Sequence, residues 1–408
     1  MDTITRAWSP VLSGDLAHRA RGRAVEIGEA LLDLPHPDAG DDHSLGNGST
    51  GLALVHSWLA EATGAAAHRE RATSYVVHAQ EAVRTRRTSA ALYGGFPGVA
   101  LAVELLGGGE RLAAVDSALV RGLSRSPWRG HFDLISGLAG VGVFALARLH
   151  RPDGARLCEL VVDRLAESGV ARGSGIVWHT PAAWMLPETA ADYPQGYDNL
   201  GMAHGSPGVI AFLAGCLGRD IATDRARALL DAAVAWVLDQ QLDSSGARFP
   251  VWRSPGDAPR PSRTAWCYGD PGVAAALLLA GRGAARPDWA ELAVEVALEA
   301  AARPPDRTGV VDASLCHGAA GLAHVLARMH QLTGVPALAD AAHPWYERAI
   351  ELPVRELDNV GFLTGTGGVA LALLAAVEPA EPTWDRTLAL SVPTPTAGNH
   401  TAVVTAKE

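Results

Sequence analysis

A four-residue turn with glycine at its first and last positions, here called a glycine turn, recurs seven times along the 408-residue chain. The copies, turns 1 to 7, are residues 48–51, 95–98, 137–140, 205–208, 269–272, 318–321 and 365–368. Four of the six intervals between successive first glycines are 42 to 49 residues long. Such a period is typical of a repeat architecture, in which each unit stacks on its neighbours to bury its apolar face. We expect the glycines to permit tight turns and close approach of main chains.

Two kinds of predicted helix alternate between the turns. Each turn precedes a run of small and apolar residues, such as Leu52–Leu59 or Val209–Leu217, which predicts a helix buried all round. Charges at helical spacing predict amphipathic helices over Asp15–Leu34, Ala66–Arg84, Arg111–Leu123, Ala155–Glu167, Arg219–Leu242, Pro287–Arg303 and Pro336–Leu352. Closing seven such pairs predicts an all-α fold, an α/α toroid of seven outer and seven inner helices. At most, Ala247–Arg253 is a candidate for a short β-ribbon.

The repeat spans residues 48 to 368, so we expect one domain over residues 1–390 and a disordered tail over 391–408. Two intervals between turns are longer than the others because of Ser174–Asn199 and Asp243–Thr264. Both insertions lead directly into a glycine turn. We therefore expect them at the same end of the fold, over the binding face.

Composition narrows the possible partners and compartment. The net charge is -10 and the sequence has no basic cluster, which argues against nucleic acid. The N-terminus has no apolar signal region, and the apolar runs are shorter than the ~20 residues that span a bilayer. We expect no transmembrane segment and a cytoplasmic location. Four cysteines in a reducing compartment indicate metal binding or catalysis rather than a disulfide scaffold.

Cys267, Cys316 and His317 form a candidate zinc site. Cys267 and Cys316 each stand two residues before the first glycine of a turn, and His317 stands directly before Gly318. Zinc takes thiolate and imidazole ligands, and three protein ligands leave one position open, as in catalytic sites. Cys158 and Cys216 lie within predicted helices and are expected to be core residues.

Further polar residues precede neighbouring turns. His204 stands directly before Gly205, and Asp133 lies four residues before Gly137. Equivalent positions of a ring point to the same end, so we expect these side chains to meet the zinc set in one pocket. The other possibilities are a turn histidine and a helix N-cap aspartate. Tyr268 and Arg263 are candidates by their proximity to Cys267.

The motifs Cys267-Tyr-Gly-x-Pro-Gly272, Cys316-His-Gly318 and Ala203-His-Gly205 resemble those of the lanthipeptide cyclase (LanC-like) family. The resemblance covers about residues 40–375 and implies the same toroid. It implies that Cys267, Cys316 and His317 bind Zn²⁺ and that His204 and Asp133 are acid–base residues. Arg263 and Tyr268 would line the site.

The implied reaction adds a peptide cysteine thiol to dehydroalanine or dehydrobutyrine and gives a thioether ring. The expected partners are a dehydrated precursor peptide with its leader and a separate dehydratase. One alternative is a non-catalytic, peptide- or thiol-binding scaffold of this family with structural zinc, which would need a fourth ligand, His204 or Asp270. Another is a protein prenyltransferase subunit, whose zinc ligands are an Asp, a Cys and a distant His; the adjacent Cys316 and His317 argue against it.

Overall fold

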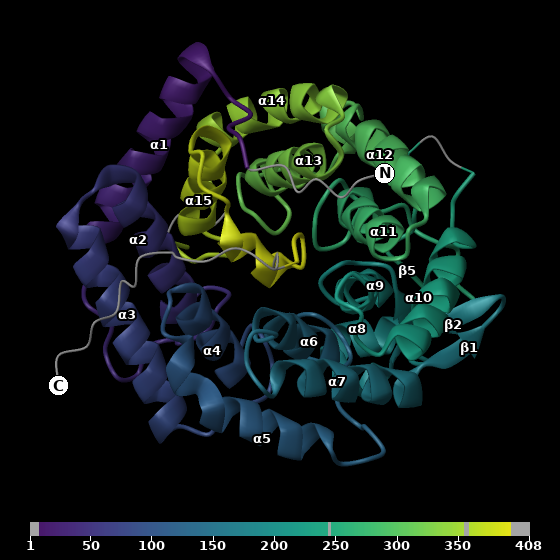
Figure 1. The fold of residues 1–408 in the computed structure, drawn as a ribbon. Coiled ribbons are helices and arrows are strands. Elements are labelled where there is room, and N and C mark those ends of the chain that lie inside the picture. Colours follow the sequence, from purple (N-terminus) through teal and green to yellow (C-terminus); the bar gives the residue numbers. More distant parts are fainter. Residues whose placement is uncertain (1–7, 244–245, 355–358, 393–408) are drawn as a thin grey trace. The chain divides into compact units, whose positions relative to one another are not determined.

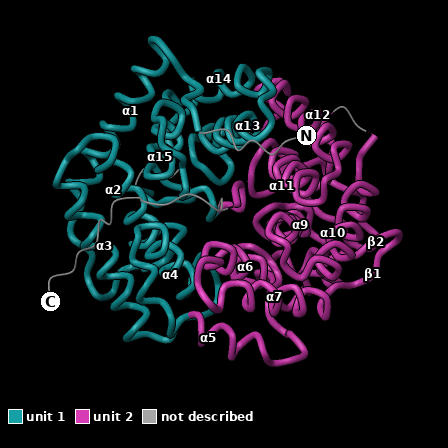
Figure 2. Tube along the Cα trace, in the orientation of Figure 1, with its two compact units in different colours: residues 1–115, 310–387, 393–408 teal, residues 116–309, 388–392 magenta. Residues whose placement is uncertain are grey.

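The computed structural model describes residues 8–243, 246–354 and 359–392. They fall into two compact units (Figure 2). Unit 1 takes in the described residues up to Val115 and from Val310 to Thr387, and unit 2 takes in those of Asp116–Gly309 and Leu388–Val392. The single domain over 1–390 stays a prediction, and the predicted disordered tail lies outside the described residues from 393 on.

Seven buried helices follow the seven glycine turns, as predicted. They are α2 (Ser49–Thr63), α4 (Phe96–Leu105), α6 (Leu138–Ala147), α9 (Ser206–Leu217), α11 (Asp270–Gly283), α13 (Ala319–Thr333) and α15 (Thr366–Val377). In α6 and α9 every residue is buried. Proline stands in the first turn of α4, α9 and α11, where its fixed φ suits the helix start and its missing N–H costs nothing. We call these the inner helices.

Seven amphipathic helices also form where the charge pattern predicts them. These outer helices are α1 (Gly14–Leu32), α3 (Ala66–Thr85), α5 (Ala113–Leu123), α7 (Gly154–Ser168), α10 (Thr223–Leu238), α12 (Pro287–Ala301) and α14 (Pro336–Glu351). Their apolar stripes face the inner helices. In α7, for example, Leu157, Val161 and Leu165 are fully buried.

Within each unit an inner helix packs on an outer one (Figure 1). In unit 1, α2 packs on α3, α13 on α14, and α15 on α1, so the last inner helix pairs with the first outer helix of the chain. In unit 2, α6 packs on α7, α9 on α10 and α11 on α12. The helix pair is therefore the repeated structural element.

The two insertions contain most of the remaining structure, and it is partly β. Strands β1 (Val170–Arg172) and β2 (Gly175–Val177) form a hairpin. Strands β3 (His179–Thr180), β4 (Tyr197–Asn199) and β5 (Trp252–Arg253) form a three-stranded antiparallel sheet in that order. The smaller helices are η1 (Gly109–Leu112), η2 (Ala182–Trp184), α8 (Pro187–Asp192), η3 (Pro305–Arg307) and η4 (Thr383–Leu388).

The three-stranded sheet joins the two insertions to each other. Strands β3 and β4 lie within the first insertion, and β5 lies within the second. Asp198 pairs with His179 on one side and with Arg253 on the other. The two insertions therefore lie together in unit 2, and their position over the binding face stays a prediction. The predicted ribbon over Ala247–Arg253 is correct only at its last two residues.

The glycines of the turns are needed for close approach. At Gly95 a Cβ atom would collide with the carbonyl oxygen of Ser89, and at Gly98 with that of Leu92. The carbonyl six residues earlier blocks a Cβ in the same way at most other glycines of the turns. The φ of Gly95 is -129°, which other residues adopt. A side chain is therefore excluded here by contact, as expected, rather than by backbone conformation.

Main-chain hydrogen bonds join successive turns within each unit. In unit 2 the amide of Ile135 donates to the carbonyl of Ala203, and the amide of Ala203 to that of Cys267, both at 3.3 Å. In unit 1 the corresponding bonds run from Cys316 to Leu363, from Leu363 to Gly46 and from Leu45 to Tyr93. Except for Leu45, these residues stand two positions before the first glycine of their turns. This position brings residues of neighbouring turns together.

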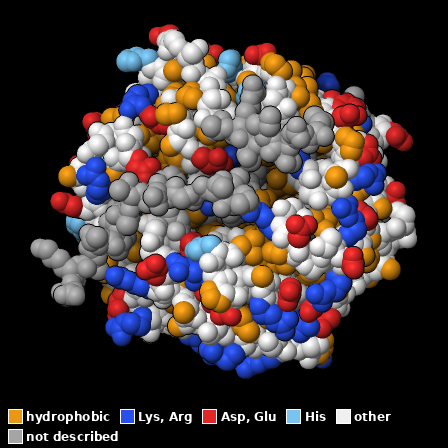
Figure 3. Space-filling view, in the orientation of Figure 1, with side chains coloured by type: hydrophobic (Ala, Val, Ile, Leu, Met, Phe, Trp, Pro, Cys, Tyr) orange, Lys and Arg blue, Asp and Glu red, His pale blue; other side chains and the backbone are white. Residues whose placement is uncertain are grey.

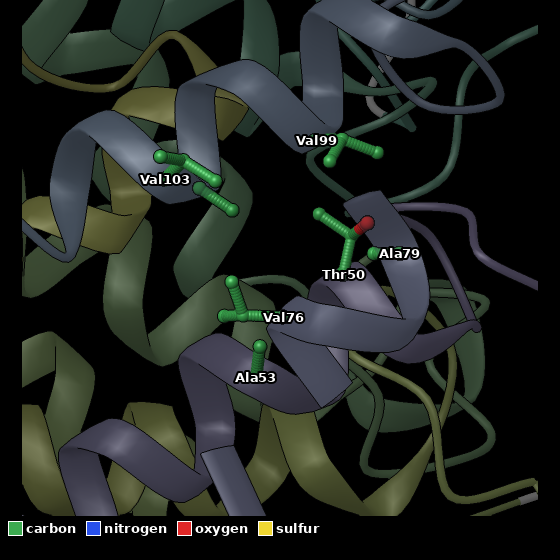
Figure 4. Close-up of a pocket in the computed structure, with 7 residues that line it drawn as sticks. Thr50, Ala53, Val76, Ala79, Val99 and Val103 are labelled. Atoms are coloured by element: carbon green, nitrogen blue, oxygen red, sulfur yellow. The ribbon is translucent and has the colours of Figure 1, made fainter. Parts of the chain in front are cut away.

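A small apolar cavity lies in unit 1 between α2, α3 and α4 (Figure 4). The space amounts to about 160 Å³, including a part open to solvent, and none of it is wide enough for a water molecule. Its lining consists of Thr50, Ala53, Val76, Ala79, Val99, Ala102 and Val103. Because these side chains are small or β-branched, they leave a narrow gap between the three helices.

None of the helices in the described part of the chain is both long and apolar enough to cross a membrane. On the face drawn in Figure 3, basic side chains are interspersed with acidic ones. The expectation that nucleic acid is not a partner stays a prediction.

Candidate active site

Asp133 and His204 lie within hydrogen-bond distance of each other in unit 2. Nδ1 of His204 is 2.8 Å from Oδ2 of Asp133. Oδ1 of Asp133 accepts from the amide of Ser136 at 2.6 Å, so both carboxylate oxygens are fixed just before α6. The side chain of His204 is 38% exposed and that of Asp133 only 9%. The imidazole is thus accessible, and the carboxylate behind it sets the ring's orientation.

Tyr268 lies against His204. The two rings are stacked, with centroids 5.9 Å apart and planes at 23°. Burial and the neighbouring Tyr197 raise the pKa of Tyr268 above its ordinary value. Its hydroxyl therefore keeps its proton at neutral pH and can donate a hydrogen bond.

Arg263 approaches Cys267 in the same unit. Its Nη2 donates to Sγ of Cys267 at 3.5 Å. Cys267 is 2% exposed and its carbonyl accepts from the amide of Ala203. A guanidinium beside a buried sulfur stabilises negative charge there. Four of the predicted site residues, together with Cys267, therefore lie in unit 2 around turns 3 to 5.

Cys316 and His317 lie in unit 1, at turn 6. Cys316 is buried and its amide donates to Leu363. Nε2 of His317 lies 3.4 Å from Oδ2 of Asp312. Burial alone would raise the pKa of Asp312, but hydrogen bonds from His317 and Ser314 lower it to about 2. Asp312 is therefore a carboxylate at neutral pH and holds the histidine ring through Nε2.

Asp312 was not predicted, but a pattern in the sequence points to it. In five turns the side chain six residues before the first glycine accepts a hydrogen bond from the amide two residues further on. The five acceptors are Asp42, Ser89, Asn199, Asp312 and Asn359. Turns 3 and 5 carry His131 and Arg263 at this position instead. The turn pattern is thus interrupted at the two turns that contain Asp133 and Arg263.

Asp270, the other candidate for a fourth metal ligand, is engaged in hydrogen bonds and an ion pair. Its carboxylate accepts from the amides of Arg248 and Phe249 at 2.7 and 3.0 Å and from the hydroxyl of Ser262 at 3.3 Å. It also pairs with Arg303. The side chain is 1% exposed. Asp270 therefore holds the second insertion against the start of α11.

The donor types suit a metal ion. Unit 2 offers the thiol of Cys267, and unit 1 offers the thiol of Cys316 and the imidazole of His317. Two thiols and an imidazole are the donors that zinc prefers. The buried carboxylate of Asp312 supplies the partner that a ligating histidine commonly has on its other nitrogen.

Comparison with known proteins gives both a family and similar solved structures. A family model described as lanthionine synthetase C-like protein matches residues 40–389. Among solved structures, nisin cyclase is similar, with a TM-score of 0.75 and 18% sequence identity over 91% of this chain and 97% of that chain. No curated protein matches. The structural match, with the seven inner and seven outer helices, confirms the predicted fold class, an all-α toroid.

Proposed function

The chain belongs to the lanthionine synthetase C-like protein family, and on this premise we propose that it is a lanthionine cyclase. The reaction adds a cysteine thiol of a dehydrated peptide to a dehydroalanine or dehydrobutyrine of the same peptide. The observation that carries the proposal is the Asp133–His204 pair, because the addition needs a group that moves a proton to carbon. The structural likeness to nisin cyclase supports the same activity.

We propose that Cys267, Cys316 and His317 hold a zinc ion. Nε2 of His317 faces Asp312, so the proposed ligand atom is Nδ1, on the other side of the ring. Cys267 and Cys316 occupy the same position in successive turns, and main-chain hydrogen bonds join that position in other successive pairs. When bound, the zinc ion would favour the thiolate form of the substrate cysteine.

The protein side chains account for the proton transfers. Asp133 accepts a hydrogen bond from Nδ1–H of His204. Nε2 is therefore the nitrogen that exchanges a proton with the substrate. Nε2 takes the proton of the thiol, the sulfur bonds to the β-carbon, and the π electrons of the alkene pass to the enolate. His204 then returns the proton to the α-carbon, so the thiol has been added across the alkene. Tyr268 donates a hydrogen bond to the enolate oxygen, and Arg263 stabilises the Cys267 sulfur.

We further propose that the substrate is a precursor peptide with its leader and that a separate dehydratase supplies the alkene. The addition starts from a residue that is already dehydrated. We also propose a cytoplasmic location, where thiols stay reduced.

A scaffold with structural zinc would need a fourth protein ligand. The carboxylate of Asp270 is occupied by Arg248, Phe249, Ser262 and Arg303, which weighs against its use as a ligand. His204 is occupied at Nδ1 by Asp133. Zinc-edge absorption spectroscopy on the purified protein would count the protein ligands, and three would agree with a catalytic site.

The direct test uses a synthetic peptide that carries one dehydroalanine and one cysteine. We expect the zinc-loaded protein to remove the thiol's reactivity toward N-ethylmaleimide, measured by mass spectrometry, without a change in peptide mass. The same peptide with serine in place of dehydroalanine should keep its free thiol. If the thiol of the dehydrated peptide still reacts fully with N-ethylmaleimide after incubation, the proposal is refuted.

A further inference from the structure

The sheet that joins the two insertions has one aromatic face. Residues paired across antiparallel strands point to the same side, and residues two apart along a strand do too. Thr180, Tyr197, Asn199 and Trp252 therefore share one face. None of the four carries a charge.

The other face of the sheet is polar and already paired. Nδ1 of His179 lies 2.7 Å from Asp198, which also accepts from Arg172 at 3.2 Å. Arg253 donates to Gln240 at 2.8 Å. The side chains of this face bind polar groups of unit 2 itself. The aromatic face is therefore the better candidate for binding a ligand.

The aromatic face continues into the candidate active site. Tyr197 and Trp252 are stacked, with ring centroids 4.8 Å apart and planes at 14°. Trp252 meets Tyr268 edge-on at 6.4 Å, and Tyr268 stacks on His204. Tyr193 packs edge-on against both Tyr197 and Trp252 and is buried. A row of rings thus leads from His204 to the sheet.

The side chains of Tyr197 and Trp252 are partly accessible from outside. Both are half-buried, whereas Tyr193 behind them is 4% exposed. The buried ring of Tyr193 packs behind Tyr197 and Trp252. The exposed parts of these two rings offer apolar surface to a ligand.

We propose that Trp252 and Tyr197 bind the residue of the peptide that flanks the alkene and so determine which sequences are cyclised. This rests on the proposed function, since His204 must reach the α-carbon of the dehydrated residue. The ring centroids are 5.9 Å apart from His204 to Tyr268 and 6.4 Å from Tyr268 to Trp252, so the side chain next to a residue bound at His204 is long enough to reach the row. The row selects an apolar side chain over a negatively charged one there, because the electron-rich faces of aromatic rings repel a carboxylate.

The experiment compares three synthetic dehydrated peptides that differ only in the residue before the alkene: Leu, Gly or Asp. Equilibrium dissociation constants come from fluorescence anisotropy of labelled peptides, and kcat and KM from the alkylation assay. We expect the parent protein to favour the Leu peptide over the Gly peptide by roughly three- to tenfold in both Kd and kcat/KM, with the Asp peptide weakest.

The variant Trp252→Thr keeps a β-branched strand residue and removes the ring. It should reduce the Leu-to-Gly ratio to near one, mainly through Kd and KM, while Trp252→Phe restores much of the ratio. Arg253→Thr is the matched control, because it changes the same strand on the opposite face. It should keep the parent ratio.

The two possible failures can be told apart. If the parent forms no thioether from any peptide, the proposed function is refuted. If the parent forms thioethers and Trp252→Thr keeps both zinc and the parent ratio, this inference alone is refuted. A ratio lost equally in Trp252→Thr and Arg253→Thr also refutes it, since the sheet would then act only as a support.

Discussion

Nδ1 of His204 lies 2.8 Å from Oδ2 of Asp133, and the second oxygen of that carboxylate is fixed by the amide of Ser136. The imidazole is therefore held by a group that cannot easily rotate away. A ring held in this way presents a single nitrogen, Nε2, to a substrate.

Replacing His204 by Asn should leave the metal bound and remove most of the turnover, because the three proposed ligands remain and the proton carrier does not. General acid–base groups contribute typically about 10²–10⁴-fold. Asp133→Asn should give a smaller loss, since its amide can still accept from Ser136 but offers Nδ1 the wrong partner. Metal content and ring formation measured on both variants check this. Full metal with near-parent turnover in His204→Asn would remove it from the catalytic residues.

Replacing Cys316 by Ala should lose the metal while the helical content survives, because the inner and outer helices build the core without the ion. The matched control is Cys158→Ala, which removes a buried thiol from α7 and should keep one metal per chain. Inductively coupled plasma mass spectrometry and far-ultraviolet circular dichroism measure the two properties. Stoichiometric metal in the Cys316 variant would contradict the ligand assignment.

A buried histidine pair in unit 1 should lower the free energy of unfolding as the pH falls. Nδ1 of His56 lies 2.8 Å from Nδ1 of His68. Burial and the charges of His68 and Arg71 lower the pKa of His56 from 6.5 to about 3. The unfolded chain therefore takes up the proton first, so stability present above pH 6.5 is lost as pH falls from there toward 3. At pH 5 the loss is roughly 2 kcal/mol.

The variant His56→Leu/His68→Leu should show a shallower dependence of the urea midpoint on pH between 6.5 and 4.5. The control His18→Leu, at an exposed position, should keep the parent's slope. Equal slopes in all three proteins would show that the pair does not govern acid stability.

A longer side chain should be tolerated better at the gap between α2, α3 and α4 than in a closely packed part of the core (Figure 4). Val76→Ile adds one methylene, worth up to about 0.8 kcal/mol, beside the narrow gap, whose partial opening to solvent lets the neighbouring side chains give way. The same exchange at Val234, which is fully buried in α10, should destabilise by about 1–3 kcal/mol through overpacking. The urea midpoint should therefore fall less in Val76→Ile than in Val234→Ile, and an equal fall would mean that the gap cannot accept a methylene.

The helices could be predicted from the sequence because their signal repeats. Each inner helix is mostly apolar and starts at a glycine turn, so one clear copy, such as α9, identifies the others. His204 and Asp133 were found for the same reason, since their positions relative to a turn are fixed. Their hydrogen bond confirms that they meet.

The sheet and the histidine pair carry no such signal. Strand β5 has only two residues, too few for alternation to show, and its pairing with β4 is set by a contact between distant segments. His56 lies within an apolar run and looks like an ordinary core residue until its neighbour on α3 is known. Asp312 could have been found by aligning the turns on the residue six before each glycine.

Because β4 pairs with β5, the two insertions must be exchanged together when the protein is engineered. A graft that brings in a foreign segment for 174–199 alone would leave β5 without its partner and expose main-chain N–H and C=O groups. A chimaera that transfers both segments with their register would keep those groups paired. Libraries for altered peptide choice should therefore vary the two segments jointly.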